Sequence, residues 1–244
     1  MKFVMSKPLK SESPLSFAVI RVPFFLEPHY DETKPFIESN RDRLVKKWGG
    51  QDGWERQKRI HDLKGRGIEA GIPHFNLDRL ASNSMASHRL IQHVGKRYGL
   101  SASEALYDRL NVYYFVEGYA LNDRPRLAKV AAETLAQTLA TAENNSAPPM
   151  TEEEILAFLN GNEGRKEIEN AIHALHELGV HGIPKFIIEG SSVVDGAALP
   201  NTFVRIFREI EERGEVKGPV FGDILGLDQN LIMKASHTPK TLAA

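Results

Sequence analysis

Three histidines near the end of one predicted helix have the spacing that most directly suggests chemistry. His173, His176 and His181 form an H-x-x-H-x4-H pattern, and Glu177 adds a carboxylate. Residues three apart share a helix face, so His173 and His176 are a conceivable pair of metal ligands. The order matches neither the H-E-x-x-H nor the H-x-x-E-H zinc pattern. We interpret the group as a solvated helix end, where imidazolium suits the helix dipole, and expect no metal site.

A second polar group stands at the start of another helical pattern. Asn83, His88 and Arg89 lie within the stretch NSMASHRLIQ. Asn83 either hydrogen-bonds a ligand or caps the helix that follows, and the residues leave both roles open. For His88 and Arg89 we favour packing between domains.

Composition limits the remaining chemistry. The 244 residues include no cysteine, which excludes disulfides, thiolate metal sites and a catalytic thiol from this sequence. We therefore assign no catalytic residue.

The charge balance also narrows the partners. With 31 basic and 32 acidic residues the formal net charge is -1, so we expect no general attraction to nucleic acid or to an anionic membrane. The charged run from Arg41 to Lys47 is interpreted as the solvated face of a helix. No apolar run is long enough to span a bilayer, and no signal-peptide core follows the first lysines. We predict a cytoplasmic protein.

Hydrophobic periodicity predicts the elements that position these side chains. Residues 17–26, FAVIRVPFFL, are β-branched and aromatic and predict a largely buried strand. Helical patterns then dominate for about 150 residues. Capping boxes are predicted at Ser101–Glu104 and at Thr151–Glu154. Gly179 is predicted to follow the C-terminus of the helix that carries His173.

The period changes after Gly179. Residues 185–189 and 192–195 flank a glycine-serine turn and predict a hairpin. An amphipathic helix is predicted over 201–213, and a loose tail at the end of the chain. A single sheet would bring the hairpin and the strand at 17–26 together, so the prediction is an α/β fold.

Several segments of this sequence resemble one known family. Residues 179–190, GVHGIPKFIIEG, then 194–197, VDGA, then 200–203, PNTF, are similar to the end of a DsbA-like thioredoxin domain. Residues 23–28, PFFLEP, and 83–92, NSMASHRLIQ, resemble its FrnE-type branch. That branch is related to the 2-hydroxychromene-2-carboxylate isomerases and to kappa-class glutathione transferases.

The resemblance implies a binding groove. The Ile183–Pro184 bond would be cis and would face the active site, as the proline before the hairpin strand does in thioredoxin folds. The backbone of Gly182 and Ile183 would then be open to an extended peptide or to glutathione, added as a strand. Asn83 would lie near this cleft. The expected site residues are therefore Gly182, Ile183, Pro184 and Asn83.

The resemblance also implies a domain plan, an α/β thioredoxin-like (DsbA-type) sheet with a large all-helical insertion. The predicted parts are an irregular segment 1–16, a thioredoxin-like domain formed by 17–35 and 179–213, a helical insertion 36–178, and a partly disordered C-terminal extension 214–244.

One expected unit is not found. The family places a strand and a C-x-x-C helix before the segment that corresponds to residues 23–28, but here only 22 residues precede Pro23. Ser13-Pro-Leu-Ser16 imitates the serine string of the isomerase relatives, yet it runs directly into the predicted strand. The first strand and active-site helix are thus missing or degenerate. Either the sequence is truncated, or it is a degenerate member kept for binding.

Three functions follow from the resemblance. The first is a DsbA-like disulfide oxidoreductase family member that lacks its redox pair. The second is a non-catalytic peptide-binding or scaffold module that uses the cis-proline groove. The third is a glutathione transferase or isomerase, which Ala197-Ala198-Leu199 disfavours, because kappa-class relatives hold glutathione with a Ser-Asp pair there. No cofactor other than a possible glutathione is expected, and a homodimer is a possible assembly.

Overall fold

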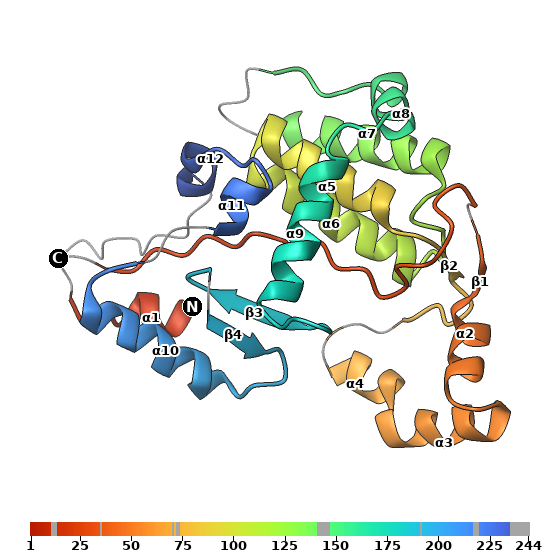
Figure 1. Cartoon of the computed structure of the whole chain (residues 1–244), viewed down its shortest axis with the longest axis horizontal. Helices are drawn as coiled ribbons and strands as arrows, with labels where there is room; N and C mark the ends of the chain where they lie inside the picture. Colours follow the sequence, from red (N-terminus) through yellow and green to blue (C-terminus); the bar gives the residue numbers. More distant parts are fainter. Residues whose placement is uncertain are drawn as a thin grey trace. The chain divides into compact units, whose positions relative to one another are not determined.

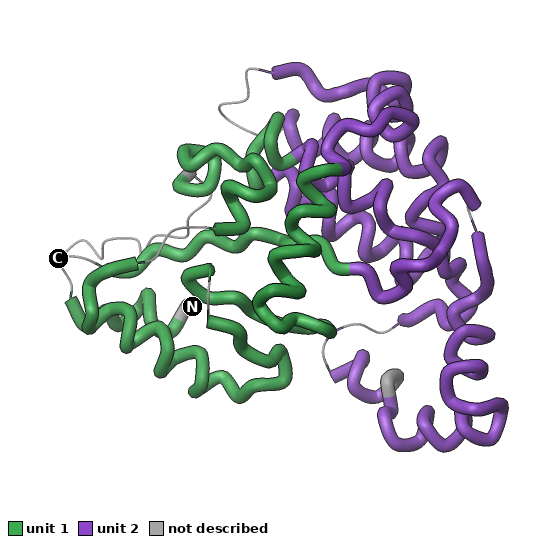
Figure 2. Tube along the Cα trace, viewed as in Figure 1, with its two compact units in different colours: residues 1–24, 95–101, 166–244 green, residues 25–94, 102–165 purple. Residues whose placement is uncertain are grey.

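The computed structural model describes residues 1–10, 14–34, 36–69, 71, 74–140, 147–190, 192–216 and 220–234. The chain forms two compact units (Figure 2). Unit 1 comprises Met1–Phe24, Gly95–Ser101 and Lys166–Ala244, and unit 2 comprises Phe25–Val94 and Ala102–Arg165. The domain boundaries drawn from the family resemblance stay predictions. None of the helices in the described part of the chain has the length and hydropathy that crossing a bilayer requires.

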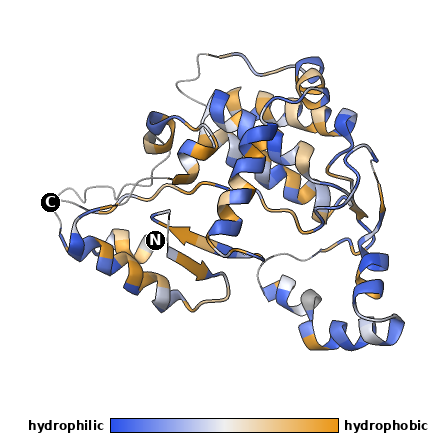
Figure 3. Ribbon diagram, in the orientation of Figure 1, coloured by the Kyte–Doolittle hydropathy of each residue, from blue (hydrophilic) through white to orange (hydrophobic). Residues whose placement is uncertain are grey.

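Unit 1 is built around an antiparallel hairpin of β3 (Lys185–Ile188) and β4 (Ser192–Asp195) (Figure 1). Lys185 lies opposite Asp195. At the turn, Glu189 and Gly190 have positive φ values of 54° and 73°, and Gly190 adopts this conformation without a steric penalty. Figure 3 shows apolar residues along both strands. The predicted hairpin is confirmed.

The helix α10 (Pro200–Arg213) packs against this hairpin. It begins with proline in its first turn and ends at Gly214, whose φ of 76° suits a helix C-terminus. The ring of Phe203 contacts Phe186 of β3 edge-on at 5.1 Å between centroids, and Phe207 contacts Phe17 in the same way at 4.9 Å. The contact of Phe203 holds α10 to the hairpin, and the contact of Phe207 holds it to the N-terminal segment.

The helix α9 (Arg165–Glu177) leads into the hairpin. Gly179 follows it with a φ of 71°, and the N–H groups of Gly179 and Val180 donate to the carbonyls of His176 and Leu175. These bonds satisfy carbonyl groups that a helix end leaves without partners. The predicted role of Gly179 is confirmed.

The predicted strand over residues 17–26 is wrong. The segment forms no strand, and its regular pairing is limited to an isolated bridge at Phe17. A strand requires a neighbour that completes its hydrogen-bond ladder. Among the described residues β3 pairs with β4 alone, so the expected single sheet does not form. Strand propensity in residues 17–26 is therefore overruled by the lack of a partner.

The two chain ends are also more helical than predicted. Residues Lys2–Ser6 form α1, although the first 16 residues were expected to be irregular. Val4 is fully buried, and the guanidinium of Arg208 in α10 donates to the carbonyl of Lys7 at 2.6 Å. Packing on α10 thus stabilises a helix too short to form alone. Towards the other end, α11 (Val220–Ile224) and α12 (Gln229–Lys234) contribute buried apolar side chains. Residues 235–244 of the predicted tail lie outside the described residues.

Unit 2 is predominantly helical. The strands β1 (Glu38–Ser39) and β2 (Leu80–Ala81) form a short antiparallel pair. The first three helices of the unit lie between these strands in the sequence. The first helices are α2 (Asn40–Lys47), α3 (Gln51–His61) and α4 (Leu63–Glu69). The later ones are α5 (Met85–Tyr98), α6 (Leu100–Phe115), α7 (Arg124–Ala140) and α8 (Glu152–Asn160), of which α5 and α6 each include residues assigned to unit 1. Leu90, Leu106, Leu127 and Leu135 are completely buried in the core.

One of the two predicted capping boxes is confirmed. The hydroxyl of Thr151 accepts from the N–H of Glu154, and the Glu154 carboxylate accepts from the N–H of Thr151. The box at Ser101 is wrong, because α6 already begins at Leu100 and Ser101 lies within its first turn.

Candidate functional site

The segment Gly182–Ile183–Pro184 lies immediately before β3 in unit 1. Ile183 is 50% exposed, Pro184 is exposed, and the peptide bond between them is cis. Within the described part of the chain, no hydrogen bond engages the main chain of Gly182 or Ile183. These N–H and C=O groups are therefore available to a ligand that approaches with its own backbone.

Gly196 holds this segment in place from the end of β4. Its N–H donates to the carbonyl of Pro184 at 3.0 Å. A Cβ atom added at Gly196 would lie 2.5 Å from Cγ and 2.6 Å from Cβ of Pro184. This close approach requires a residue without a side chain. It gives a physical reason for the glycine in the VDGA segment.

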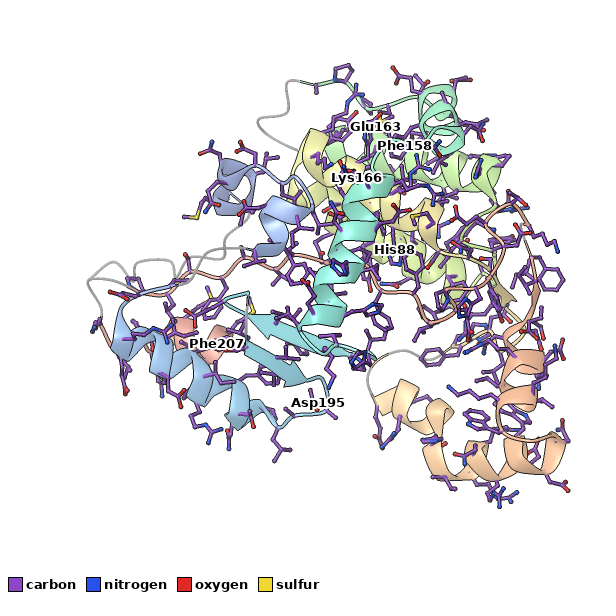
Figure 4. All side chains as sticks on the ribbon, in the orientation of Figure 1. His88, Phe158, Glu163, Lys166, Asp195 and Phe207 are labelled. Atoms are coloured by element: carbon purple, nitrogen blue, oxygen red, sulfur yellow. The ribbon has the colours of Figure 1, made fainter. Side chains whose placement is uncertain are left out.

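The edge of β3 beside the segment is apolar and open. Phe186 is 51% exposed even though its ring packs on Phe203. The hairpin is a two-stranded sheet within the described residues, so the outer edge of β3 has no strand against it there. On the opposite face of the hairpin, Lys185 and Asp195 form an ion pair at 2.5 Å. Figure 4 places Asp195 at the end of β4.

An ion pair fixes the far end of the hairpin. The guanidinium of Arg213, in the last turn of α10, donates to the carboxylate of Glu189 at the hairpin turn. The Glu189 side chain is only 8% exposed. The hairpin is thus anchored to α10 at one end by this pair and along its length by Phe203, which leaves residues 182–184 on a rigid support.

Asn83, the fourth predicted site residue, belongs to unit 2 and is 5% exposed. Its amide oxygen accepts from the N–H of Met85 at 2.8 Å, and its amide nitrogen donates to the carbonyl of Tyr30 at 2.8 Å. The first bond satisfies an N–H at the start of α5, as the capping interpretation expects. Both polar atoms of Asn83 therefore have partners within unit 2.

The Tyr30 segment is held by a network that sequence inspection missed. Asn122 donates to the carbonyls of Glu32 and Lys34, and the guanidinium of Arg165 makes a two-point ion pair with the carboxylate of Glu32. This pair holds the pKa of Glu32 below its ordinary value, with burial acting in the opposite direction. The partners are 133 residues apart, so no local pattern links them.

Tyr30 itself is tied to a neighbouring carboxylate. Its hydroxyl donates to Glu38 at 2.6 Å. Burial, together with this bond, raises the pKa of the Tyr30 hydroxyl. The hydroxyl therefore stays protonated and serves as a hydrogen-bond donor at neutral pH.

Arg89 and His88 have packing roles in the described contacts. The guanidinium of Arg89, 2% exposed, donates to the carbonyls of Phe158, Leu159 and Glu163 at the end of α8. Burial lowers the pKa of Arg89. The ring of His88, labelled in Figure 4, meets Phe25 edge-on at 5.2 Å. Two of the sequence segments that carry the resemblance therefore touch each other in unit 2.

The histidine pattern is partly brought together. The rings of His176 and His181 lie 6.0 Å apart, and His173 pairs with Glu177 at 3.4 Å. All three histidines are exposed. Among the described residues there is no cluster of three or more His, Asp or Glu that could hold a metal ion. Ser13 of the serine string lies outside the described residues.

The fold of this protein is DsbA-like, a thioredoxin-like fold with a large helical part. A crystal structure of a probable DsbA oxidoreductase from Streptomyces coelicolor matches it with a TM-score of 0.60, at 21% identity over 80% of this chain and 75% of that chain. A likeness at this identity establishes the fold. No protein-family model matches the chain, and no curated protein matches it.

Proposed function

We propose that this protein binds an extended peptide through Gly182–Ile183–Pro184 and the adjoining edge of β3, without thiol chemistry of its own. The observation that carries the proposal is the combination of unengaged main-chain groups at Gly182 and Ile183 with an open strand edge directly after them. An extended peptide completes such an edge as an added strand, and its backbone supplies the hydrogen bonds.

The exposed side chains at this site are apolar and therefore favour a ligand with apolar side chains. Ile183 and Phe186 are each about half exposed. An added strand would cover both side chains, and burial contributes about 25 cal/mol per Å² of apolar surface removed from water. Main-chain hydrogen bonds would supply affinity, and the two side chains would favour apolar residues in the ligand.

The absence of cysteine from the sequence limits the chemistry that the proposal can include. The sequence contributes no thiolate, so disulfide exchange by these residues has no nucleophile. Membership of the FrnE-type branch is part of the proposal, and it rests on the matched segments of the sequence. Glutathione, a short peptide itself, is the alternative ligand.

The test is a binding titration with fluorescein-labelled, alkylated insulin B chain, followed by fluorescence anisotropy. Gly182→Val places a branched side chain in open space at the proposed site, since no atom lies within 4 Å of a Cβ there. We expect it to weaken binding by about tenfold or more while the thermal unfolding temperature is kept. Gly161→Val is the matched control in unit 2, where a Cβ meets only ordinary contacts, and should bind as the parent does.

Three results would overturn the proposal. Equal affinity of the Gly182→Val and Gly161→Val variants would show that peptide binds elsewhere or not at all. Turnover of insulin disulfides by this chain would contradict the exclusion of thiol chemistry. Displacement of the labelled peptide by glutathione at micromolar concentration would show that glutathione is the ligand of this site.

A further inference from the structure

The helices α2, α3 and α4 form a segment that differs in charge from the rest of the protein. This segment, residues 40–69, is called the basic arm below. It contains nine basic and five acidic residues, a formal excess of four positive charges, while the whole chain has a net charge of -1. The near-neutral total therefore conceals a separation of charge between the basic arm and the remaining residues.

The inner side of the basic arm is tightly packed. Trp54 of α3 is 2% exposed and stacks on Trp48 at 5.5 Å between ring centroids. A Cβ at Gly53 would lie 1.8 Å from the carbonyl oxygen of Trp48, so α3 approaches the end of α2 as closely as glycine allows. This packing fixes which face of α3 is directed away from α2.

The outer side of the basic arm carries cations and apolar side chains together. Arg56, Arg59 and Ile60 occupy positions i, i+3 and i+4 of α3 and are all exposed, with Ile60 at 65%. On α4, Arg66 and Ile68 are exposed as well, with Ile68 at 58%. The exposed face of α3 thus presents two guanidinium groups beside an isoleucine, and α4 presents one guanidinium group and one isoleucine.

The cations of this outer side differ from those of α2. Arg41, Arg43 and Lys46 of α2 pair with Asp78, Glu27 and Glu38. By contrast, no ion pair engages Arg56, Arg59 or Arg66 within the described residues. Three guanidinium groups therefore remain for an anionic partner.

We propose that the basic arm binds an acidic, amphipathic segment of a partner protein. Carboxylates would pair with Arg56, Arg59 and Arg66, and apolar side chains would cover Ile60 and Ile68. Guanidinium groups form two-point hydrogen bonds with carboxylates, and charge complementarity raises the rate of association.

The surface favours protein over other anionic partners. Nucleic-acid phosphates would pair with the guanidinium groups but would leave both isoleucines uncovered. A helix that lies on a membrane presents tryptophan to the lipid, whereas Trp54 is buried against Trp48. An acidic amphipathic segment meets both the charges and the apolar side chains.

The arrangement of tryptophans provides a direct readout. Both tryptophans of the chain, Trp48 and Trp54, lie in the basic arm. Their emission therefore reports the integrity of the arm in each variant. Binding is measured by anisotropy of a labelled synthetic peptide that repeats glutamate and leucine at helical spacing, with a glutamate–serine peptide as the comparison.

The variants separate charge from apolar contact. R56E/R59E should weaken binding of the glutamate–leucine peptide by about tenfold or more, with unchanged tryptophan emission. Lys129→Glu, a charge reversal at an exposed site on α7, is the control and should change affinity less than about twofold. I60S/I68S should weaken binding of the glutamate–leucine peptide and leave the weaker glutamate–serine peptide unaffected.

Three outcomes would overturn the proposal. R56E/R59E changes the net charge by four units and Lys129→Glu by two, so a free-energy loss in Lys129→Glu about half of that in R56E/R59E would mean that binding follows net charge alone. Tighter binding of single-stranded RNA than of the glutamate–leucine peptide would assign the basic arm to nucleic acid. Tighter binding to phosphatidylserine vesicles would assign it to membranes.

Discussion

Gly182, two residues before Pro184 in the sequence, and Gly196, which contacts Pro184 from the end of β4, provide the sharpest test of how the site is built. In Gly196→Ala the new Cβ would lie 2.5 Å, 2.6 Å and 2.9 Å from three atoms of Pro184, whereas ordinary contacts begin at 3.4 Å. Residues 182–184 must shift by about 1 Å to relieve this overlap, and overpacking of this kind costs about 1–3 kcal/mol. In Gly182→Ala the Cβ meets no atom within 4 Å.

The two variants should therefore differ in the free energy of unfolding. Loss of the hydrogen bond from Gly196 to Pro184 adds about 0.5–1.5 kcal/mol to the cost of Gly196→Ala. Alanine restricts the unfolded chain and returns about 0.4–1 kcal/mol in both variants. The net expectation is a destabilisation of about 0.5–4 kcal/mol for Gly196→Ala and a stabilisation of about 0.4–1 kcal/mol for Gly182→Ala.

Urea titration followed by circular dichroism measures both free energies under the same conditions. Peptide affinity, measured by anisotropy, should fall in Gly196→Ala because the segment that contains Pro184 is displaced. If Gly196→Ala unfolds at the same urea concentration as Gly182→Ala, the contact between Gly196 and Pro184 does not constrain this segment, and the reasoning fails.

Three further predictions concern unit 2. Arg89→Met keeps most of the buried side-chain volume but removes the guanidinium that donates to three carbonyl groups at and just after the end of α8. A destabilisation of about 2–4 kcal/mol is therefore expected by urea titration, and a change below about 0.5 kcal/mol would refute it. The folded-state pKa of Glu32 is lowered, so its contribution is fully present above its ordinary value of 4.5 and is lost as pH falls through the lowered value. The difference in melting temperature between parent and Glu32→Gln should accordingly be constant near pH 7 and shrink below pH 4.5, and a difference that grows on acidification would contradict this sign. Thr151→Ala should cost about 1 kcal/mol, whereas Ser101→Ala, at the capping box that does not form, should cost almost nothing; equal losses would show that the Thr151 box contributes no stability.

Local sequence signals were sufficient for three interactions that are themselves local. The hairpin of β3 and β4, the capping box at Thr151 and the helix end at Gly179 each depend on residues a few positions apart. Their turn residues and spacing could therefore be interpreted without knowledge of the remaining chain.

Sequence patterns failed to predict the local structure where residues far away in the sequence determine it. Residues 17–26 have strand composition but lack a neighbouring strand, and residues 2–6 become helical because they pack on α10. Asn83 was open to two roles until its contacts with Met85 and Tyr30 were seen, since a polar amide in a sequence does not reveal what lies opposite it.

The sequence by itself determined the chemical limits of this protein. No cysteine means no thiol, and the resemblance of residues 179–203 to the end of a DsbA-like thioredoxin domain implied the segment that forms the candidate site. Only the tertiary structure decided which main-chain groups are open, why Gly196 must lack a side chain, and which cations of residues 40–69 have no ion pair among the described residues. These properties depend on distances between residues far apart in the chain, which the fold brings together and no local pattern records.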